Sequence, residues 1–406
     1  MVDADAILAS LFAEDARKDP YPTYAKLRDL GPISPLDKRA PGMTPLVAVA
    51  TGYDLIDQVL RDPKYYKKRG DEWWDHPILT TFHSSMMFSN PPDHGRMRRV
   101  FQKVFTPRRL SVLEPIVHRV ADELLDRMAD LGADGSELDY VADFAFPMPA
   151  RVMAEFLGIP DSDLEWYRAR VQRVDDYLDL DGKTPERLQA ADTAAAELRD
   201  YYVEMIANRR RHSRDDLVSA LVEANDSGES QMTETELISN LIVLFNASFV
   251  TTVHLLGTGL PLLLARPDLT KALPGNLELA LDCVHEILRY DSSVQFLIRS
   301  APYDLELGGV PVPKDGSVLL LIAGANRDSE RFADADTFQP DRGKAPPLSF
   351  GAGLHFCLGA GVTRIEGQVA LSKLFQRFPD LKLAGTPVGN GSLFLRGLKH
   401  VPIALS

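Results

Sequence analysis

Cysteine is almost absent from this chain of 406 residues, which contains only Cys283 and Cys357. Two thiols exclude a disulfide framework and fit a reducing compartment, in which any important thiol acts alone. Basic residues are also few: 45 lysines and arginines against 58 acidic residues give a net charge of −13. We therefore expect no nucleic acid as a partner, because a phosphate backbone attracts positive charge.

Targeting signals and linkers are missing as well. Residues 1–15 lack the basic region, apolar stretch and cleavage site of a signal peptide, so we expect a cytoplasmic protein. No internal repeat and no glycine-, serine- or proline-rich linker divides the chain. The long apolar run at 237–264 is interrupted by polar residues and Pro261, which favours a buried core helix and no membrane.

Helical patterns dominate what is present. Pro20 and Pro22 begin a helix that stops at Gly31, and Thr106-Pro107 begins another that stops at Gly132. A capping box at Thr233–Glu236 begins a long helix of about 234–265, which ends before Pro267. A shorter helix is predicted at 277–290.

Strand patterns are short and confined to a few segments, at 46–50, 305–312 and 318–323. The chain lacks the regular alternation of strands and helices that builds a parallel sheet. We therefore predict a mainly α fold with small β-sheets, in a single domain spanning residues 1–406.

The most informative segment is Phe350-Gly351-Ala352-Gly353-Leu354-His355-Phe356-Cys357-Leu358-Gly359. It is not a dinucleotide fingerprint, because Phe356 occupies the position of the third glycine. Around the cysteine, glycines allow tight turns and a close approach to a bulky planar group. A helix that begins after Cys357 would direct backbone N–H groups at its sulfur, as expected at a thiolate-ligated iron.

These ten residues resemble the haem-binding signature of the cytochrome P450 family, F-G-x-G-x-H-x-C-x-G, at every specified position. The resemblance extends from about Asp19 to the end of the chain. It implies a P450 fold with the helix at about 234–265 over haem b, and Cys357 as the metal ligand. Phe350, Gly351 and Gly359 would then contact the cofactor, and the length and missing anchor are typical of bacterial members.

A second match lies in Glu286-Ile287-Leu288-Arg289, whose charges at i and i+3 share one helix face. It resembles the family's E-x-x-R element, with Arg342 as the arginine that completes the set. The resemblance implies a structural role for Glu286, Arg289 and Arg342, which would brace the cysteine loop. The alternative, a zinc motif that begins at His285, fails because Arg289 occupies the second histidine position.

Asn90-Pro91-Pro92-Asp93-His94-Gly95-Arg96-Met97-Arg98 resembles the family segment that contacts a haem propionate. By itself it would be an ordinary solvated basic turn. Together with the cysteine motif, it makes His94, Arg98, Arg299 and His355 the expected partners of the two carboxylates.

On the long helix, Asn246-Ala247-Ser248-Phe249-Val250-Thr251-Thr252 aligns with the family's oxygen-activation stretch. The resemblance makes Thr251 and Cys357 the catalytic residues and places Ala247 beside the cofactor. Val250 replaces the usual acid, so protons would come from a water held by Thr251 and Ser248 or Asn246, or from the substrate. The third alternative is a chemistry that consumes an oxygen intermediate before the second protonation. Back-bonding of the Thr251 hydroxyl to the carbonyl at i−4 is compatible with this role.

The substrate pocket is expected to be apolar. The segment before His94 is the family's most variable lid, and here it carries Trp73, Trp74, Phe82, Met86, Met87 and Phe88. These large and adaptable side chains favour an apolar small molecule such as a secondary metabolite, free or delivered on a carrier protein. The expected pocket residues are Met86, Met87, Phe88, Val243, Asn246, Ala247, Val250, Val294, Phe296 and Phe394.

The resemblance implies a monooxygenase that uses dioxygen and two electrons from a ferredoxin or a similar partner. The alternatives are a peroxide-driven haem peroxygenase, which usually lacks the threonine, a non-catalytic haem-binding recruitment module, and a cysteine hydrolase. An acidic ferredoxin would be repelled by the net charge of −13. A local basic patch would overcome this, and the candidates are Arg99, Lys103, Arg108 and Arg109; an ordinary solvated face is the alternative.

Overall fold

A four-stranded sheet and a larger body of helices form the part of the chain that the computed structural model describes, residues 3–37, 46–67, 75–179, 184–228, 231–343 and 345–405. The side chains of residues 107 and 108 are also outside the description. The sheet order is β1 (Ile33–Pro35), β2 (Leu46–Ala50), β7 (Ser317–Leu320) and β4 (Leu297–Ser300). Only the β2–β7 pair is parallel within this sheet.

Smaller sheets join distant segments. They are β5 (Leu305–Leu307) with β6 (Val310–Val312), β9 (Val388–Gly389) with β10 (Leu398–His400), and β11 (Pro402–Ala404) between β3 (Leu138–Asp139) and β8 (Lys382–Leu383). The predicted segment 305–312 is a hairpin that folds at Gly308 and Gly309, both with positive φ. These pairings confirm the prediction of small sheets.

The predicted strand at 318–323 is wrong at its end. It stops at Leu320, and Ile322–Ala325 forms the short helix α15. Gly324 allows this short helix to pack closely on Tyr24, because a Cβ at Gly324 would lie only 3.1 Å from the Cβ of Tyr24. The Arg28 guanidinium also donates to the Gly324 carbonyl at 3.0 Å, which fixes the helix against the N-terminal region.

Helices make up most of the described chain. Besides α15 they are α1 (Ala4–Ala9), α2 (Glu14–Lys18), α3 (Tyr21–Arg28), α4 (Tyr53–Arg61), α5 (Pro77–His83), α6 (Asp93–Val104), α7 (Pro107–Leu131), α8 (Pro147–Leu157), α9 (Leu164–Leu178), α10 (Pro185–Arg211), α11 (Leu217–Asp226), α12 (Glu234–Leu264), α13 (Pro267–Ala272), α14 (Leu277–Tyr290) and α16 (Ala360–Arg377). Shorter turns include the π-helical Val141–Ala145 and the 3-10 helices Met86–Phe88, Leu348–Phe350 and Gly353–His355.

Capping residues set the predicted helix ends. Thr106 accepts the first-turn N–H of Arg109, and Gly132 caps the other end of α7. Both hydrogen bonds of the capping box at Thr233 and Glu236 are present at the start of α12. The predictions for α7, α12 and α14 are confirmed.

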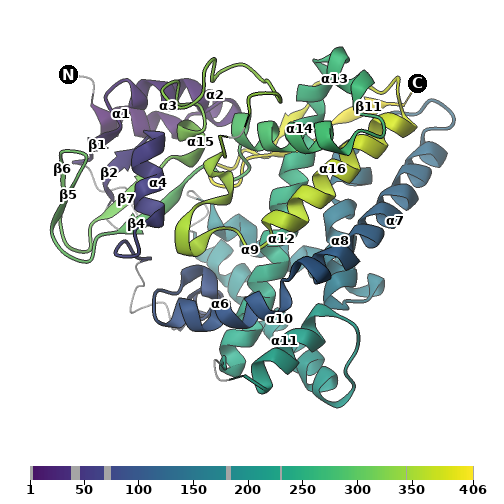
Figure 1. Cartoon of the computed structure of the whole chain (residues 1–406), viewed down its shortest axis with the longest axis horizontal. Helices are drawn as coiled ribbons and strands as arrows, with labels where there is room; N and C mark the ends of the chain where they lie inside the picture. Colours follow the sequence, from purple (N-terminus) through teal and green to yellow (C-terminus); the bar gives the residue numbers. More distant parts are fainter. Residues whose placement is uncertain are drawn as a thin grey trace.

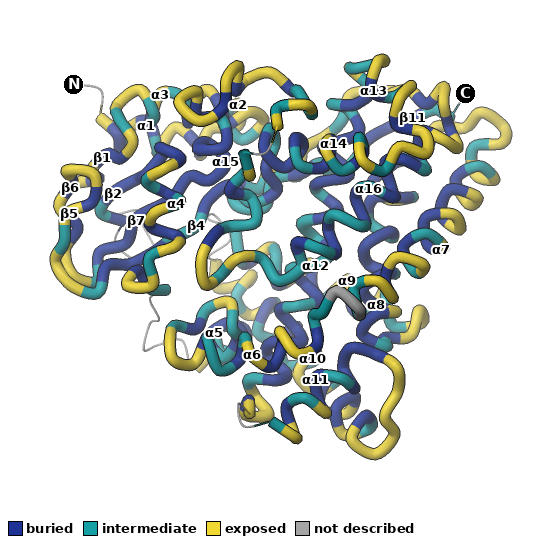
Figure 2. Tube along the Cα trace, in the orientation of Figure 1, coloured by how far each residue is buried: buried dark blue, intermediate teal, exposed yellow. Residues whose placement is uncertain are grey.

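Helix α12 crosses the middle of the molecule (Figure 1). It packs against α8, α5, α16, α10 and α14, and it is buried or half-buried over most of its length (Figure 2). By length and composition α12 would also pass for a membrane span, but 67% of its most apolar window is buried inside the protein. It is therefore built as a core helix, apolar because it is surrounded by protein.

Candidate active site

The loop that carries Cys357 is held by backbone contacts. The Cys357 N–H donates to the Phe350 carbonyl at 2.9 Å, and the two 3-10 turns of the loop precede it. Gly351 and Gly353 have φ values of +66° and +65°, which disfavour any side chain. At Gly353 a Cβ would also lie 2.4 Å from the Leu60 carbonyl oxygen, so a side chain at this position would collide with α4.

The Cys357 thiol lies just before the N-terminus of α16. Burial raises its pKa, while the backbone N–H groups of Gly359 and Ala360 and the positive charge of Arg98 oppose that rise. The predicted backbone donors to the sulfur are therefore present. Cys283 is different: it is fully buried in α14, and burial raises its pKa to about 12.

The three charged residues predicted to be structural form a buried network. Arg289 donates to both Glu286 oxygens at 2.7 Å, and the Arg342 Nε donates to Glu286 Oε1 at 3.0 Å. The remaining guanidinium donors of Arg289 reach the carbonyls of Asn326, Ala335 and Thr337. The buried charges thus have hydrogen-bond partners, the condition under which such a network is tolerated.

Hydrogen bonds link this network to the cysteine loop. The Ser349 hydroxyl donates to the Leu288 carbonyl of α14 at 2.6 Å and accepts from Asn326 at 2.8 Å. The Asn326 side chain in turn accepts the Leu348 N–H at 2.7 Å. The segment that leads to Cys357 is therefore fixed to the end of α14.

Basic side chains from three segments converge beside the loop. His94 lies in the first turn of α6, and its ring centroid is 4.3 Å from that of His355. Arg98 donates to the Phe356 carbonyl at 3.0 Å, and Arg299, on β4, is 4% exposed. The structure therefore brings together all four residues predicted to bind propionates.

Sequence reasoning missed a fifth basic group, Lys67. Its charge, with that of Arg98, lowers the pKa of His94, which burial has already reduced, to about 4. Asn90 holds the Lys67 backbone through two hydrogen bonds of 2.9 Å, and the Lys67 ammonium donates to the Met87 carbonyl. Lys67 follows α4 in a loop without a motif, so the sequence carries no signal for it.

The basic cluster has no acidic partner among the described residues. Within the described part of the chain, neither ring nitrogen of the buried His94 has a hydrogen-bond partner. Burial also lowers the pKa of Arg299 to about 10. No carboxylate is among the groups that shift His94, His355 or Lys67. A buried dianion at this position would supply the missing acceptors.

On α12, the hydroxyl groups bond back to the helix. Thr251 donates to the Ala247 carbonyl at 3.0 Å, and Ser248 donates to the Leu244 carbonyl at 2.5 Å. The Thr251 carbonyl accepts from the Ser293 hydroxyl at 2.9 Å. This bond links Thr251 to the segment that precedes β4.

A buried acid beside this stretch was also missed. Glu366 of α16 is fully buried, and burial raises its pKa to about 8, although the nearby Thr252 opposes the rise. An acid nine residues after Cys357, in an otherwise buried helix, was a signal that the sequence offered. The stretch on α12 therefore has a carboxyl group beside Thr252, on a neighbouring helix and not on α12 itself.

The predicted pocket residues fall into two groups. The Met86 N–H donates to Asn240 of α12 at 2.9 Å, while Phe88 and Val243 pack around Phe82. In the second group, Val294 forms an isolated β-bridge with Leu395, and the ring centroids of Phe296 and Phe394 lie 5.1 Å apart. Ala247 and Val250 are half-buried, Asn246 is buried and Met87 is exposed. Trp73 and Trp74 lie outside the described residues.

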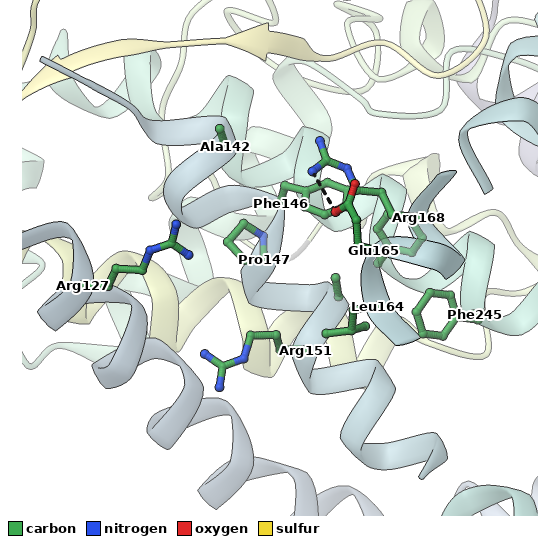
Figure 3. A pocket seen from close by; sticks show the side chains of 11 residues that line it. Arg127, Ala142, Phe146, Pro147, Arg151, Leu164, Glu165, Arg168 and Phe245 are labelled. Atoms are coloured by element: carbon green, nitrogen blue, oxygen red, sulfur yellow. Dashed lines mark ion pairs between the residues drawn. The ribbon is translucent and has the colours of Figure 1, made fainter. Parts of the chain in front are cut away.

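A cavity of about 310 Å³ lies on a different face of α12 (Figure 3). Its walls include Phe245 and Phe249, which pack against one another and toward α8 and α9. Arg168 lies 4.0 Å over the Phe146 ring and pairs with Glu165 at 3.7 Å. None of the predicted site residues lines this cavity, so we do not assign the chemistry to it.

Comparisons with known proteins agree with this geometry. The family model described as "Cytochrome P450" matches residues 38–386. The chain belongs to the cytochrome P450 family. It is 35% identical over 399 residues to cytochrome P450 monooxygenase PikC of Streptomyces venezuelae, covering 96% of this chain and 92% of that one. It is 35% identical over 403 residues to 6-deoxyerythronolide B hydroxylase of Saccharopolyspora erythraea, covering 95% and 96%.

A solved structure places this P450 in the same fold. The structure of P450BioI in complex with hexadec-9Z-enoic acid ligated acyl carrier protein superposes with a TM-score of 0.89, at 29% identity, over 97% of this chain and 99% of that one. The predicted mainly α P450 fold is confirmed, as is the assignment to the bacterial P450 oxidoreductases, which use haem b. The residues of this P450 fit haem b, because the basic cluster and the unpaired His94 nitrogens lie beside the Cys357 loop.

Proposed function

We propose that Cys357 would bind haem b through its thiolate in this bacterial monooxygenase. The observation that carries the proposal is the Cys357 sulfur in front of the α16 N-terminus, next to the basic cluster. Haem b, when bound, activates dioxygen with electrons from a redox partner. The chain's own part is to hold the thiolate through Gly359 and Ala360 N–H groups and to fix the loop through Ser349.

We assign the propionate carboxylates to His94, Arg98, Arg299 and His355, and we add Lys67. The supporting observation is that these groups converge without an acid, so two carboxylates would neutralise part of the charge. Phe350, Gly351, Gly359 and Ala247 are proposed to contact the cofactor. Thr251 is proposed to orient a water or a substrate oxygen, because its hydroxyl oxygen still has acceptor capacity after it donates to Ala247.

The proposed substrate is a mainly apolar small molecule, an intermediate of secondary metabolism. Support comes from the relative named 6-deoxyerythronolide B hydroxylase and from the apolar residues around Val243. The neighbouring structure with an acyl carrier protein supports delivery on a carrier as a second route. We place the protein in the bacterial cytoplasm, with a ferredoxin or a similar donor as its electron source.

The proposed docking surface for that donor lies near the cysteine loop. Lys103 is exposed at the end of α6, and Arg109 lies 3.9 Å from Asp215. Leu354 and Phe356 of the loop are 43% and 41% exposed, which adds apolar area to the basic residues. Arg99 has partners of its own, and the Arg108 side chain is outside the described residues.

The test is the spectrum of the reduced carbon monoxide complex. Wild-type protein should show the red-shifted Soret band of a thiolate-ligated haem, and Cys357→Ala should abolish it. Cys283→Ala is the matched control and should keep the band, because that thiol is fully buried in α14. A full thiolate band in Cys357→Ala would contradict the assignment.

A further inference from the structure

One carboxyl group on α9, that of Asp175, is not among the candidate site residues. Asp175 follows Val171 by one helical turn in α9, a helix that meets α12 where Tyr167 packs on Phe245. Asn246 of α12 lies close enough to the Asp175 carboxyl group to oppose the effect of burial on its pKa. The carboxyl oxygen Oδ1 is buried and has no hydrogen-bond partner among the described residues. A buried acceptor without a donor is costly and points to a partner from outside the chain.

Asp175 also lacks a compensating charge. Asp216 pairs with Arg209 at 2.6 Å, and Glu286 has two arginines, but no described cation acts on Asp175. Among the described residues, the charged group that acts on it is Asp176 of the same helix, and α12 contributes the uncharged Asn246. Burial and Asp176 together raise the pKa of Asp175 to about 7.

The surroundings are otherwise apolar. Val174 and Tyr177, on either side of Asp175 in α9, pack in one cluster with Ile78, Phe82 and Val243. Phe88 packs against the same cluster. Val243 and Asn246 are one turn apart on α12, so the carboxyl group stands beside the proposed pocket residues. Asp175 and Asn246 are thus two polar side chains among apolar neighbours.

We propose that Asp175 and Asn246 form the substrate recognition point and bind a protonated amine of an otherwise apolar substrate. The inference rests on the proposed function, because it takes the α12 pocket as the substrate site. An ammonium N–H would donate to Oδ1 and supply the missing positive charge. A neutral hydroxyl would satisfy the oxygen but leave a buried carboxylate uncompensated. The pair therefore determines specificity by the charge of the ligand.

The test compares two probes with the same alkyl chain, N,N-dimethyloctylamine and 1-octanol. A flexible chain adapts to an apolar pocket, and a tertiary amine is too hindered to ligate iron well. Binding to the resting ferric holoenzyme is measured by titration calorimetry at pH 7.5. We expect the amine to bind at least about tenfold more tightly than the alcohol. Asp175→Asn should reduce this ratio to about one, and Asp175→Glu should retain part of it.

Asp29→Asn is the matched control. It makes the same charge change at an exposed residue that follows α3 and does not act on Asp175, so it should leave the amine-to-alcohol ratio unchanged. A ratio near one in the wild type, or an unchanged ratio in Asp175→Asn, would overturn the inference. Each variant is also checked by its carbon monoxide spectrum. Failure of the Cys357 assignment would appear in that spectrum, whereas failure of this inference would appear only in the ratio.

Thermal unfolding separates recognition from a structural role. A carboxyl whose pKa is raised on folding loses stability as the pH rises from its unfolded value near 4 to about 7. Without ligand, Asp175→Asn should therefore have a higher Tm than the wild type, with a larger difference at pH 8 than at pH 6. If the interaction with Asn246 were the whole role, the variant would have a lower Tm at both values, and the inference would be refuted.

Discussion

At the scale of single residues, burial decides which side chains carry chemistry. Cys283 and Cys357 are the same residue type, but only Cys357 has backbone N–H groups and a cation that oppose the effect of burial on its pKa. Asp175 and Glu366 differ from Asp216 and Glu286, because no described arginine pairs with them. Both lie against α12, the helix in which Val250 replaces an acid. Two carboxyl groups without a cationic partner among the described residues therefore lie beside the proposed oxygen and substrate side.

Glu366 gives a prediction for stability against pH. Its pKa is about 8 in the folded protein against an ordinary 4.5, so the wild type loses stability as the pH rises between these values. Glu366→Gln removes this term. Relative to the wild type, the variant should gain up to about 1.4 kcal/mol per pH unit between pH 6 and pH 8. Urea unfolding of the ferric protein at both pH values measures the gain.

The control for this prediction is Glu223→Gln. Glu223 is an exposed glutamate, so its replacement should change the unfolding free energy by less than about 0.5 kcal/mol at both pH values. Equal pH dependence in the wild type and Glu366→Gln would show that Glu366 is already ionised in the native state.

At the scale of elements, local signals predicted the helices and missed the contacts between them. The caps at Thr106 and Thr233 are interactions within a few residues, so the sequence was sufficient for α7 and α12. The end of β7 depended on Tyr24, a residue far away in the chain, and that prediction was wrong. Lys67 and Asp175 act through neighbours on other elements, and no local pattern identifies them.

The end of α14 gives the prediction at this scale. Arg289→Ala leaves Glu286 buried with Arg342 and the Gln339 N–H and removes the bonds to three carbonyls. We expect a loss of about 3–5 kcal/mol in unfolding free energy, together with a lower ratio of Soret to protein absorbance after purification. Arg119→Ala breaks two exposed ion pairs, with Glu123 of α7 and Glu155 of α8, and should cost less than about 1 kcal/mol. A similar small cost for both variants would show that the buried network does not brace the cysteine loop.

At the scale of the whole molecule, α12 links the two sides of the site. Helix α16, which follows the Cys357 loop and carries Glu366, packs on α12 (Figure 1), while Asp175 of α9 lies beside Asn246 of α12. The family assignment fixed the cofactor and the reaction type, because the match covers most of the chain. What remains particular to this protein is its charge distribution. A net charge of −13 and the basic patch that we propose near the cysteine loop would act in opposite directions on an acidic electron donor.

The rate of reduction by the donor shows whether the overall charge or the basic patch governs the encounter. With an acidic [2Fe-2S] ferredoxin as the donor, we expect the second-order reduction rate to fall when ionic strength rises from about 20 to 200 mM, because screening weakens the nearby patch. Lys103→Glu should lower the low-salt rate several-fold. Lys26→Glu makes the same change in net charge on α3, well away from α6 in Figure 1, and should have little effect. If the overall charge governs the encounter, the rate will instead rise with salt, and the two variants will slow it equally.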